Sequence, residues 1–233
     1  MKVTAIVPSY KPDEKLAGVL RDLAAAGFER IIVVDDGSGP EYETYFRQAE
    51  GYPQCVLLRH EVNRGKGGAL KTAFAWFLEH TGEDLGVVTV DGDGQHDPKF
   101  LEMMLTYLEK ENADMVIGSR FITKEGFQSS GLRRVGIRYF TWLIHLLTGK
   151  TITDPTSGLR MVNRSVIQQY ASCYPKDYPE PESVVTILKE EKKVKEVPVI
   201  MRERAGGVSS ISPMKSIYYM IKVTLAILIE KIR

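Results

Sequence analysis

Two aspartates and a glutamine alternate with glycines in the segment Asp91–His96, which reads DGDGQH. In an extended chain Asp91, Asp93 and Gln95 face the same way, because successive side chains point to opposite sides. Oxygen ligands at this spacing suit Mg²⁺ or Mn²⁺ bridging a diphosphate. A lone Asp-Gly-Asp is ordinarily a surface turn, but this one directly follows the apolar run LGVVTV. The segment therefore predicts a metal site at the end of a buried strand.

A glycine-rich segment, Asn63–Leu70 (NRGKGGAL), precedes a helical pattern and carries two cations. Lys66 and the backbone N–H groups of a helix start can together bind an anion. The segment is not a Walker loop, because Gly67 follows Lys66 where Ser or Thr is required. It predicts phosphate binding, with a turn that only caps the helix as the structural alternative.

The elements that must position these residues belong to an α/β fold. Helical patterns alternate with short apolar runs, which are typical of buried parallel strands. The runs lie at 3–8, 30–38, 55–59, 85–90 and 114–119. This alternation predicts a mostly parallel central sheet with helices on both faces. Four of the strand ends carry PSY, DDGS, DGDGQH and GSR, and such ends are where open α/β sheets bind ligands. One polar cleft is therefore expected.

After residue 120 the alternation ends. Apolar helices are predicted at Val135–Leu147 and near the C-terminus. Asp154–Arg160 is expected to be a turn-rich insert, and Tyr174–Glu182 (YPKDYPEPE) an open loop held by three prolines. A last strand is expected over 194–202. One domain with a mixed second half fits this pattern better than two domains.

Composition limits the possible partners and compartments. The 233 residues carry a formal net charge of +1, so no global field attracts nucleic acid, and no nucleic-acid partner is expected. Cys55 and Cys173 are far apart without metal-type spacing, which favours a reduced, intracellular protein. No run approaches the roughly 18 apolar residues that span a bilayer. We therefore expect a chain that does not cross a membrane by itself.

Seven polar or glycine-containing segments follow one another along the chain: VPSY, VVDDGS, NRGKGGAL, DGDGQHDP, GSRF, DPTSGLR and RERAGGVSS. Together they resemble the family 2 glycosyltransferases, which have a GT-A fold, and especially the polyprenyl-phosphate sugar transferases. The resemblance implies a GT-A domain over residues 1–213. Its nucleotide-sugar-binding half would be 1–120 and its acceptor half 121–213, with 214–233 a C-terminal apolar or amphipathic helix.

The resemblance also implies roles for individual residues. Asp91 and Asp93 would hold Mg²⁺ or Mn²⁺ with Gln95 as third ligand, and Asp93 and Arg120 would be catalytic. The residues implied to bind the nucleotide sugar are Pro8, Tyr10, Asp36, Lys66, Gly68, Asp91, Arg202, Arg204 and Ser209. The family's wide use of UDP makes a UDP-sugar the preferred donor, with a GDP-sugar as the alternative.

The implied chemistry is inversion by a single in-line displacement, and the acceptor decides whether a base is needed. A polyprenyl phosphate is already an anion, and Arg134, Arg138 and Arg160 are the residues expected to position it. A cell-wall or capsular glycan hydroxyl would instead need a carboxylate to take its proton. The Glu-Asp pair of many hydroxyl-acting members has no clear counterpart here. Of the acids in DYPEPE, Glu182 is the predicted base, although a structural role for this loop is equally compatible.

The sequence of the two apolar helices is compatible with more than one environment. Val135–Leu147 and Ile217–Ile232 predict either a surface for a membrane interface or a small membrane-protein partner, or helices packed against the sheet. We expect a cytoplasmic protein, peripheral at the inner face of the cell membrane. The alternative to an enzyme is a non-catalytic accessory subunit that binds a sugar nucleotide. The presence of Asp91, Asp93 and Arg120 argues against it.

Overall fold

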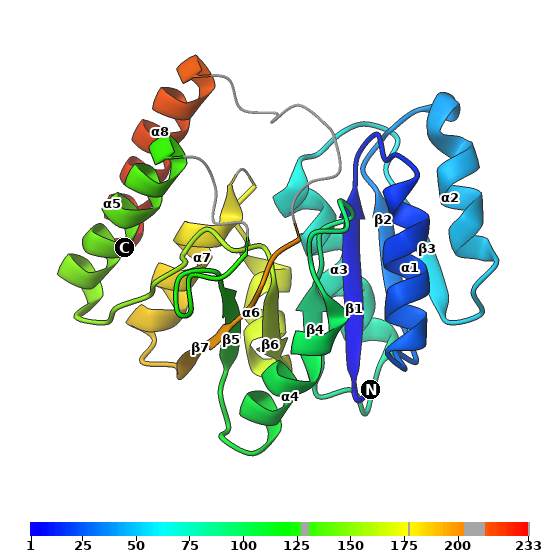
Figure 1. The fold of residues 1–233 in the computed structure, drawn as a ribbon, viewed down its shortest axis with the longest axis horizontal. Helices are drawn as coiled ribbons and strands as arrows, with labels where there is room; N and C mark the ends of the chain where they lie inside the picture. Colours follow the sequence, from blue (N-terminus) through cyan, green and yellow to red (C-terminus); the bar gives the residue numbers. More distant parts are fainter. Residues whose placement is uncertain (127–130, 177, 203–212, 233) are drawn as a thin grey trace.

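The computed structural model describes residues 1–126, 131–176, 178–202 and 213–232 (Figure 1). The strands are β1 (Val3–Ser9), β2 (Ile31–Asp35), β3 (Cys55–Arg59), β4 (Gly86–Thr89), β5 (Met115–Ser119), β6 (Arg160–Asn163) and β7 (Val194–Pro198). The α-helices are α1 (Lys15–Ala25), α2 (Glu43–Glu50), α3 (Lys66–His80), α4 (Leu101–Glu109), α5 (Gly131–Thr148), α6 (Arg164–Ser172), α7 (Pro179–Lys189) and α8 (Pro213–Ile232). Short 3₁₀ turns precede α2 and α4, at Pro40–Tyr42 and Pro98–Phe100.

The strands form one sheet in the order β3-β2-β1-β4-β6-β5-β7. In the described ranges β6 runs antiparallel to β4 and β5, whereas the pairs β1–β2, β1–β4, β2–β3 and β5–β7 are parallel. The predicted mostly parallel sheet is confirmed. Since the parallel strands point one way, their carboxyl ends meet at one edge of the sheet.

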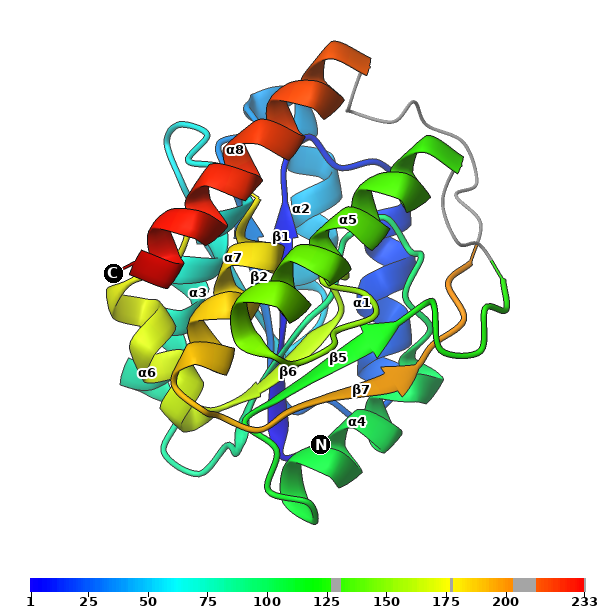
Figure 2. The same ribbon diagram turned by 90° about the vertical axis from the view of Figure 1, so that its left-hand side faces the viewer.

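Alternation along the strands explains why helices cover both faces. In β2, Ile31 and Val33 belong to a core cluster with residues of α1, α2 and α4, whereas Ile32 and Val34 belong to another with residues of α3 and α5–α8. Figures 1 and 2 show these two helical layers on either side of the sheet. All four residues are fully buried, as expected for strands covered on both sides.

The prediction that residues 174–182 form an open loop is wrong for its second half. Pro179 is the first residue of α7, and Pro181 and Glu182 lie in its first turn. Proline is tolerated there because the N–H that it lacks has no partner in the first turn of a helix anyway. The sequence pattern did not reveal β6 and α6, which follow the turn-rich insert directly.

Helices α5 and α8 lie beside each other on the sheet (Figure 2). Each buries one stripe, with Phe140 and Ile144 of α5 and Val223 and Ile227 of α8 in the same core cluster. Each also exposes apolar residues, namely Val135, Trp142 and Leu146 of α5 and Tyr218, Ile221, Leu225, Leu228 and Ile229 of α8. Core packing and an exposed apolar face are therefore both present. No helix in the described ranges has the length and apolarity needed to cross a bilayer.

Candidate active site

The polar strand ends lie along the carboxyl edge of the sheet, as the sequence predicts. Tyr10 follows β1 and is half exposed, Asp36 follows β2, Asp91 lies two residues after β4, and Arg120 follows β5. The paired register of β1 with β2 and with β4 brings the first three of these ends next to one another. The edge therefore gathers acids and cations from segments far apart in the sequence.

At the centre of this edge Lys66 joins two carboxylates. Its Nζ lies 2.7 Å from Oδ1 of Asp91 and 2.8 Å from Oε1 of Glu180. Burial alone would lower the pKa of Lys66, but the charges of Asp91 and Glu180 outweigh it and hold that pKa above its ordinary value. Lys66 is therefore a fixed positive charge between the first aspartate of the DGD segment and the start of α7.

Two glycines allow this approach. A Cβ on Gly158 would lie 2.6 Å from Oδ2 of Asp91 and 2.9 Å from Nζ of Lys66. A Cβ on Gly67 would lie 1.9 Å from the carbonyl oxygen of Pro175, and the Gly67 N–H donates to the carbonyl of Lys176. The insert before β6 and the segment before α7 thus pack directly against the site, which sequence reasoning could not foresee.

The turn after β4 is held by its own side chains. The Asp91 N–H donates to Nδ1 of His96 at 3.1 Å, and the Gln95 N–H donates to Oδ1 of Asp93 at 3.2 Å. His96 is buried, and burial lowers its pKa, which favours the neutral ring that this hydrogen bond requires. These bonds fix the positions of both aspartates.

The donor set of this turn fits a metal ion that arrives with a diphosphate. In the described part of the chain no three His, Cys, Asp or Glu side chains cluster closely enough to enclose a metal. Mg²⁺ needs no such cage, since it commonly binds one or two carboxylates together with substrate phosphates and water. Asp91 and Asp93 supply such carboxylates. The amide of Gln95 donates to the carbonyl of Arg202 at 3.1 Å, so its role as third ligand stays a prediction.

Asp36 is buried and already holds two partners. Its Oδ1 lies 2.7 Å from Nδ1 of His60 and accepts the Arg64 N–H at 2.9 Å. The other ring nitrogen of His60 contacts the Thr72 hydroxyl of α3 at 2.9 Å. Asp36 thus fastens the turn after β2 to the start of α3, and its predicted contact with the nucleoside stays a prediction. Pro8 lies within β1, and Gly68 in the first turn of α3.

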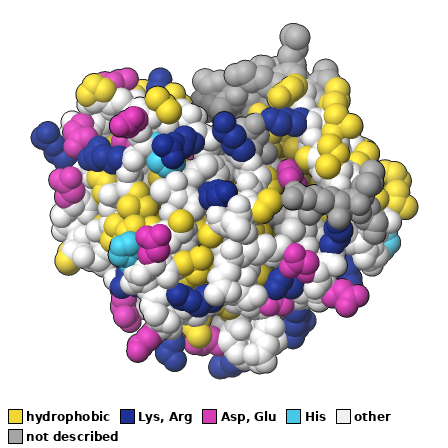
Figure 3. All heavy atoms as spheres, turned by 180° about the vertical axis from the view of Figure 1, so that it is seen from behind, with side chains coloured by type: hydrophobic (Ala, Val, Ile, Leu, Met, Phe, Trp, Pro, Cys, Tyr) yellow, Lys and Arg dark blue, Asp and Glu magenta, His cyan; other side chains and the backbone are white. Residues whose placement is uncertain are grey.

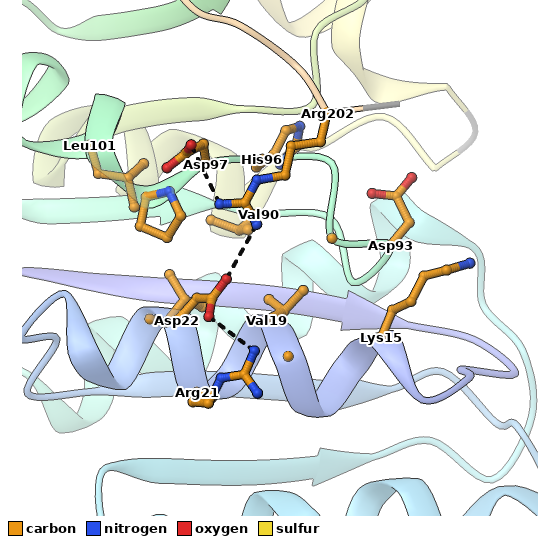
Figure 4. Close-up of a pocket in the computed structure, with 14 residues that line it drawn as sticks. Lys15, Val19, Arg21, Asp22, Val90, Asp93, His96, Asp97, Leu101 and Arg202 are labelled. Atoms are coloured by element: carbon orange, nitrogen blue, oxygen red, sulfur yellow. Dashed lines mark hydrogen bonds and ion pairs between the residues drawn. The ribbon is translucent and has the colours of Figure 1, made fainter. Parts of the chain in front are cut away.

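Arg202 ties the chain beyond β7 to the aspartate turn. Its guanidinium lies 3.5 Å from Asp22 of α1 and 3.4 Å from Asp97, and the backbone N–H of Arg202 donates to the carbonyl of Gln95. Figure 4 shows Arg202 reaching between Asp22 and Asp97 across a pocket of about 240 Å³, with Asp93 and Lys15 at one end. The predicted phosphate-binding residues Arg204 and Ser209 follow directly but lie outside the described residues.

Arg120 is held by a buried acid. Its Nε and Nη2 donate to both oxygens of Asp154 at 2.6 and 2.7 Å, and Nη2 also reaches Oγ1 of Thr156. Asp154 is fully buried, and Glu196 of β7 accepts hydrogen bonds from the backbone N–H groups of Thr153 and Asp154. The insert before β6 is therefore a built support for Arg120.

The remaining predicted residues are not brought together. Arg134 and Arg138 are exposed on α5. Arg160 is only 4% exposed and donates to the carbonyls of Ser157 and Pro155 and to the Ser183 hydroxyl, so it braces the insert against α7. The acid beside Lys66 is Glu180. Glu182, the predicted base, lies in the first turn of α7, and its role stays a prediction.

The family model described as glycosyl transferase family 2 matches residues 4–171, well over half of the chain. The chain belongs to glycosyl transferase family 2. It is thus a glycosyltransferase, as the resemblance predicted.

Relatives narrow the resemblance to polyprenyl-phosphate sugar transferases. The undecaprenyl-phosphate mannosyltransferase of Micrococcus luteus is 31% identical over 228 residues, covering 91% of this chain and 88% of its own. The UDP-N-acetylglucosamine–dolichyl-phosphate N-acetylglucosaminyltransferase of Methanococcus voltae is 28% identical over 177 residues, 70% of each chain. An uncharacterized protein of Methanocaldococcus jannaschii is 32% identical over 201 residues, 85% of this chain and 80% of its own.

Solved structures confirm the GT-A fold. Glucosyl-3-phosphoglycerate synthase from Mycobacterium tuberculosis, in complex with Mn²⁺, UDP and glucosyl-3-phosphoglycerate, aligns with a TM-score of 0.72 at 19% identity. The alignment covers 98% of this chain and 79% of the synthase. Another structure of that synthase holds Mg²⁺ and UDP.

Proposed function

We propose that this glycosyltransferase moves a sugar from a nucleotide-diphosphate donor to a polyprenyl phosphate at the cytoplasmic face of a membrane. A UDP-sugar is the preferred donor and a GDP-sugar the alternative, in keeping with the UDP-bound structures of the same fold. The acceptor class rests on the relatives from Micrococcus luteus and Methanococcus voltae, whose names include undecaprenyl phosphate and dolichyl phosphate.

A structural observation that agrees with this acceptor class is the ion pair of Glu180. This carboxylate of the predicted acceptor half lies next to the aspartate turn through Lys66, whose Nζ is 2.8 Å from its Oε1. The Oε1 atom that a hydroxyl acceptor would need as its proton acceptor is therefore already engaged by an ammonium group. A phosphate acceptor needs no base, whereas a sugar hydroxyl does.

The roles of the chain's own residues follow from their positions. Asp91 and Asp93 would hold Mg²⁺ or Mn²⁺, which when bound supplies positive charge for the leaving diphosphate. Lys66 places a second, permanent positive charge at the same point. Arg120, locked by Asp154, presents a rigid guanidinium at the end of β5, and such preorganised charges lower the barrier because they need no rearrangement. We infer a single in-line displacement with inversion of the sugar configuration.

Exposed apolar residues of α5 and α8 support the membrane-face location. Trp142 and Ile221 are 57% and 58% exposed, on helices that also contribute to the core. A helix surface that combines buried and exposed apolar stripes suits an interfacial position, in which the outer stripe enters the headgroup region. A small membrane-protein partner on the same surface stays a proposal without support of its own.

The test of this function compares acceptors and two carboxylate variants. The protein is assayed with Mn²⁺ and UDP- or GDP-sugars, with a short polyprenyl phosphate or a glycan hydroxyl as acceptor. Asp93→Ala is expected to lower transfer to the polyprenyl phosphate by about 100-fold or more, the typical effect of removing one electrostatic contribution. Glu182→Gln is expected to keep substantial activity. If the wild-type protein transfers sugar only to the glycan hydroxyl, and Glu182→Gln loses nearly all of that activity, the acceptor is a glycan and not a phosphate.

A further inference from the structure

A second pocket, of about 410 Å³, lies beside Lys66 where the starts of α3 and α7 meet α8. The side chains important for its chemistry are Lys66, Lys176, Glu180, Tyr218 and Lys222. Because Nζ of Lys66 is also 2.7 Å from Asp91, the pocket adjoins the aspartate turn directly. An occupant of this pocket would therefore face a donor held at Asp91 and Asp93.

The charge of this lysine pocket favours an anion. Among the described residues that line it, three lysines stand against one glutamate. Lys66 is paired with Asp91 and Glu180, and Lys176 and Lys222 bring two further ammonium groups to the same pocket. Lys222 is half-buried, with its Nζ 5.7 Å from the centre of the Tyr218 ring. Charges in a partly desolvated pocket act more strongly on a ligand than charges in open water.

We propose that the lysine pocket binds the phosphate of the acceptor, with Lys176 and Lys222 as its positioning residues. The inference rests on the proposed function and goes beyond it, because the sequence pointed to Arg134, Arg138 and Arg160 instead. A phosphate oxygen held there forms the new bond to the anomeric carbon as the bond from that carbon to the diphosphate oxygen breaks. The nucleoside diphosphate leaves with the electron pair. The attacking oxygen is anionic, so no proton has to be removed.

The surface next to the pocket indicates a lipid rather than a soluble phosphate. Tyr218 lines the pocket and also begins the exposed apolar stripe of α8, which continues through Ile221, Leu225, Leu228 and Ile229. Spacings of three and four residues place these side chains on one face of the helix. Figure 3 shows hydrophobic side chains gathered over this part of the molecule. An isoprenoid tail leaving the pocket would therefore meet an apolar path.

The kinetic test uses Lys222→Gln and Lys176→Gln, alone and together, in the full chain. Each is expected to raise the KM for a short polyprenyl phosphate about tenfold, the loss expected for one hydrogen bond to a charged group. The donor KM should change less than about twofold, since neither lysine contacts the aspartate turn in the contacts described. Lys222→Arg is expected to restore most of the acceptor affinity. Lys2→Gln is the matched control, because Lys2 is 76% exposed and precedes β1, at the opposite edge of the sheet.

Transfer that continues with an unchanged acceptor KM in both glutamine variants would overturn the lysine pocket and leave the proposed function standing. A binding experiment without catalysis tests the pocket independently of the proposed function. Without donor or metal, farnesyl phosphate is expected to bind the wild-type chain more tightly than inorganic phosphate or farnesol, and the double variant is expected to lose this preference. Equal affinity for inorganic phosphate and farnesyl phosphate would contradict the inference that the bound phosphate belongs to a lipid. Farnesyl phosphate binding with no transfer to any polyprenyl phosphate would overturn the proposed function and support the pocket.

Discussion

The carboxylate–lysine–carboxylate bridge of Asp91, Lys66 and Glu180 joins two parts of the candidate active site. Lys66 lies in the half predicted to bind the nucleotide sugar, and Glu180 in the half predicted to bind the acceptor. The pKa of Lys66 is held above its ordinary value, so the side chain stays charged at neutral pH and acts as a fixed electrostatic element. Any change that moves Lys66 should therefore affect catalysis before it affects folding.

Gly158 offers a test of that expectation. Gly158→Ala would place a methyl group 2.6 Å from Oδ2 of Asp91 and 2.9 Å from Nζ of Lys66. Both side chains would have to move away from this methyl group. A displacement near 1 Å in a reacting site can cost on the order of 100-fold. We expect kcat/KM to fall by roughly 10- to 100-fold, with little change in Tm. The control is Gly82→Ala, because no heavy atom lies within 4 Å of a Cβ there. Full activity in Gly158→Ala would contradict the importance of the bridge.

Single residues differ in how far the sequence could predict them. Asp91 and Asp93 could be assigned because alternation after an apolar run reveals both the strand end and the shared side. Glu180 could not, because its role depends on α7 starting at Pro179 and on α3 lying against that start. Gly158 likewise gives no local signal, since its requirement comes from side chains far away in sequence.

At the scale of elements, the start of α3 is fixed by contact with the segment before α7. The Gly67 N–H donates to the carbonyl of Lys176 at 3.1 Å, and no side chain fits between them. The parallel strands and the helices α1, α3 and α4 could be predicted from period alone. The elements β6, α6 and α7 could not, because β6 is only four residues long and the prolines of α7 suggest a loop.

Gly67→Ala should destabilise the fold rather than only the site. The added Cβ would lie 1.9 Å from the Pro175 carbonyl oxygen, which is backbone and cannot swing away. Overpacking of this kind costs about 1–3 kcal/mol in the free energy of unfolding. Gly18→Ala in α1 is the comparison, since its nearest neighbour is the flexible Arg21 side chain at 3.9 Å. There alanine is expected to stabilise the helix by about 0.5–1 kcal/mol. Urea unfolding measures both, and equal stability of the two variants would contradict the close packing.

Glu196 predicts a pH dependence of stability. Burial raises its pKa above the ordinary 4.5, although the backbone N–H groups of Thr153 and Asp154 donate to it. The folded state therefore binds more protons than the unfolded state in the window above pH 4.5. The contribution of this group to the free energy of unfolding is fully present below pH 4.5 and is lost as pH rises through the folded pKa. Glu196→Gln removes that loss, so the free energy of unfolding of the wild type should fall relative to that of the variant from pH 4.5 toward 7 in urea titrations. A constant difference would contradict the raised pKa.

At the scale of the whole molecule, the site opens beside an apolar surface. The carboxyl edge of the sheet carries the acids and cations, and α8 contributes both to the lysine pocket and to the exposed apolar stripe. The net charge of +1 provides only weak general attraction to an anionic bilayer. Membrane association would therefore depend on apolar side chains more than on charge.

Ile221→Ser with Leu225→Ser tests this dependence. Both residues are more than half exposed, at 58% and 54%, so the fold should be kept. Burying a Leu or Ile side chain in an apolar environment is worth about 1.5–3 kcal/mol when complete. Partial burial of two predicts at least a roughly tenfold weaker binding to anionic vesicles in a sedimentation assay. Met103→Ser on α4, 42% exposed, is the control that should change nothing. Equal vesicle binding by the double variant and wild type would place the membrane contact elsewhere.

The most direct test of the central claim is the product of one reaction. Wild-type protein is incubated with Mn²⁺, a UDP- or GDP-sugar and a short polyprenyl phosphate, with the matching polyprenol, a glycan acceptor and a sample with chelator run in parallel. The products are identified by mass spectrometry, and their anomeric configuration is assigned by NMR. We predict a sugar-phosphoryl-polyprenol of inverted anomeric configuration that forms only with the phosphate and disappears with the chelator. A product on the polyprenol or on a glycan hydroxyl, with none on the phosphate, would contradict the claim.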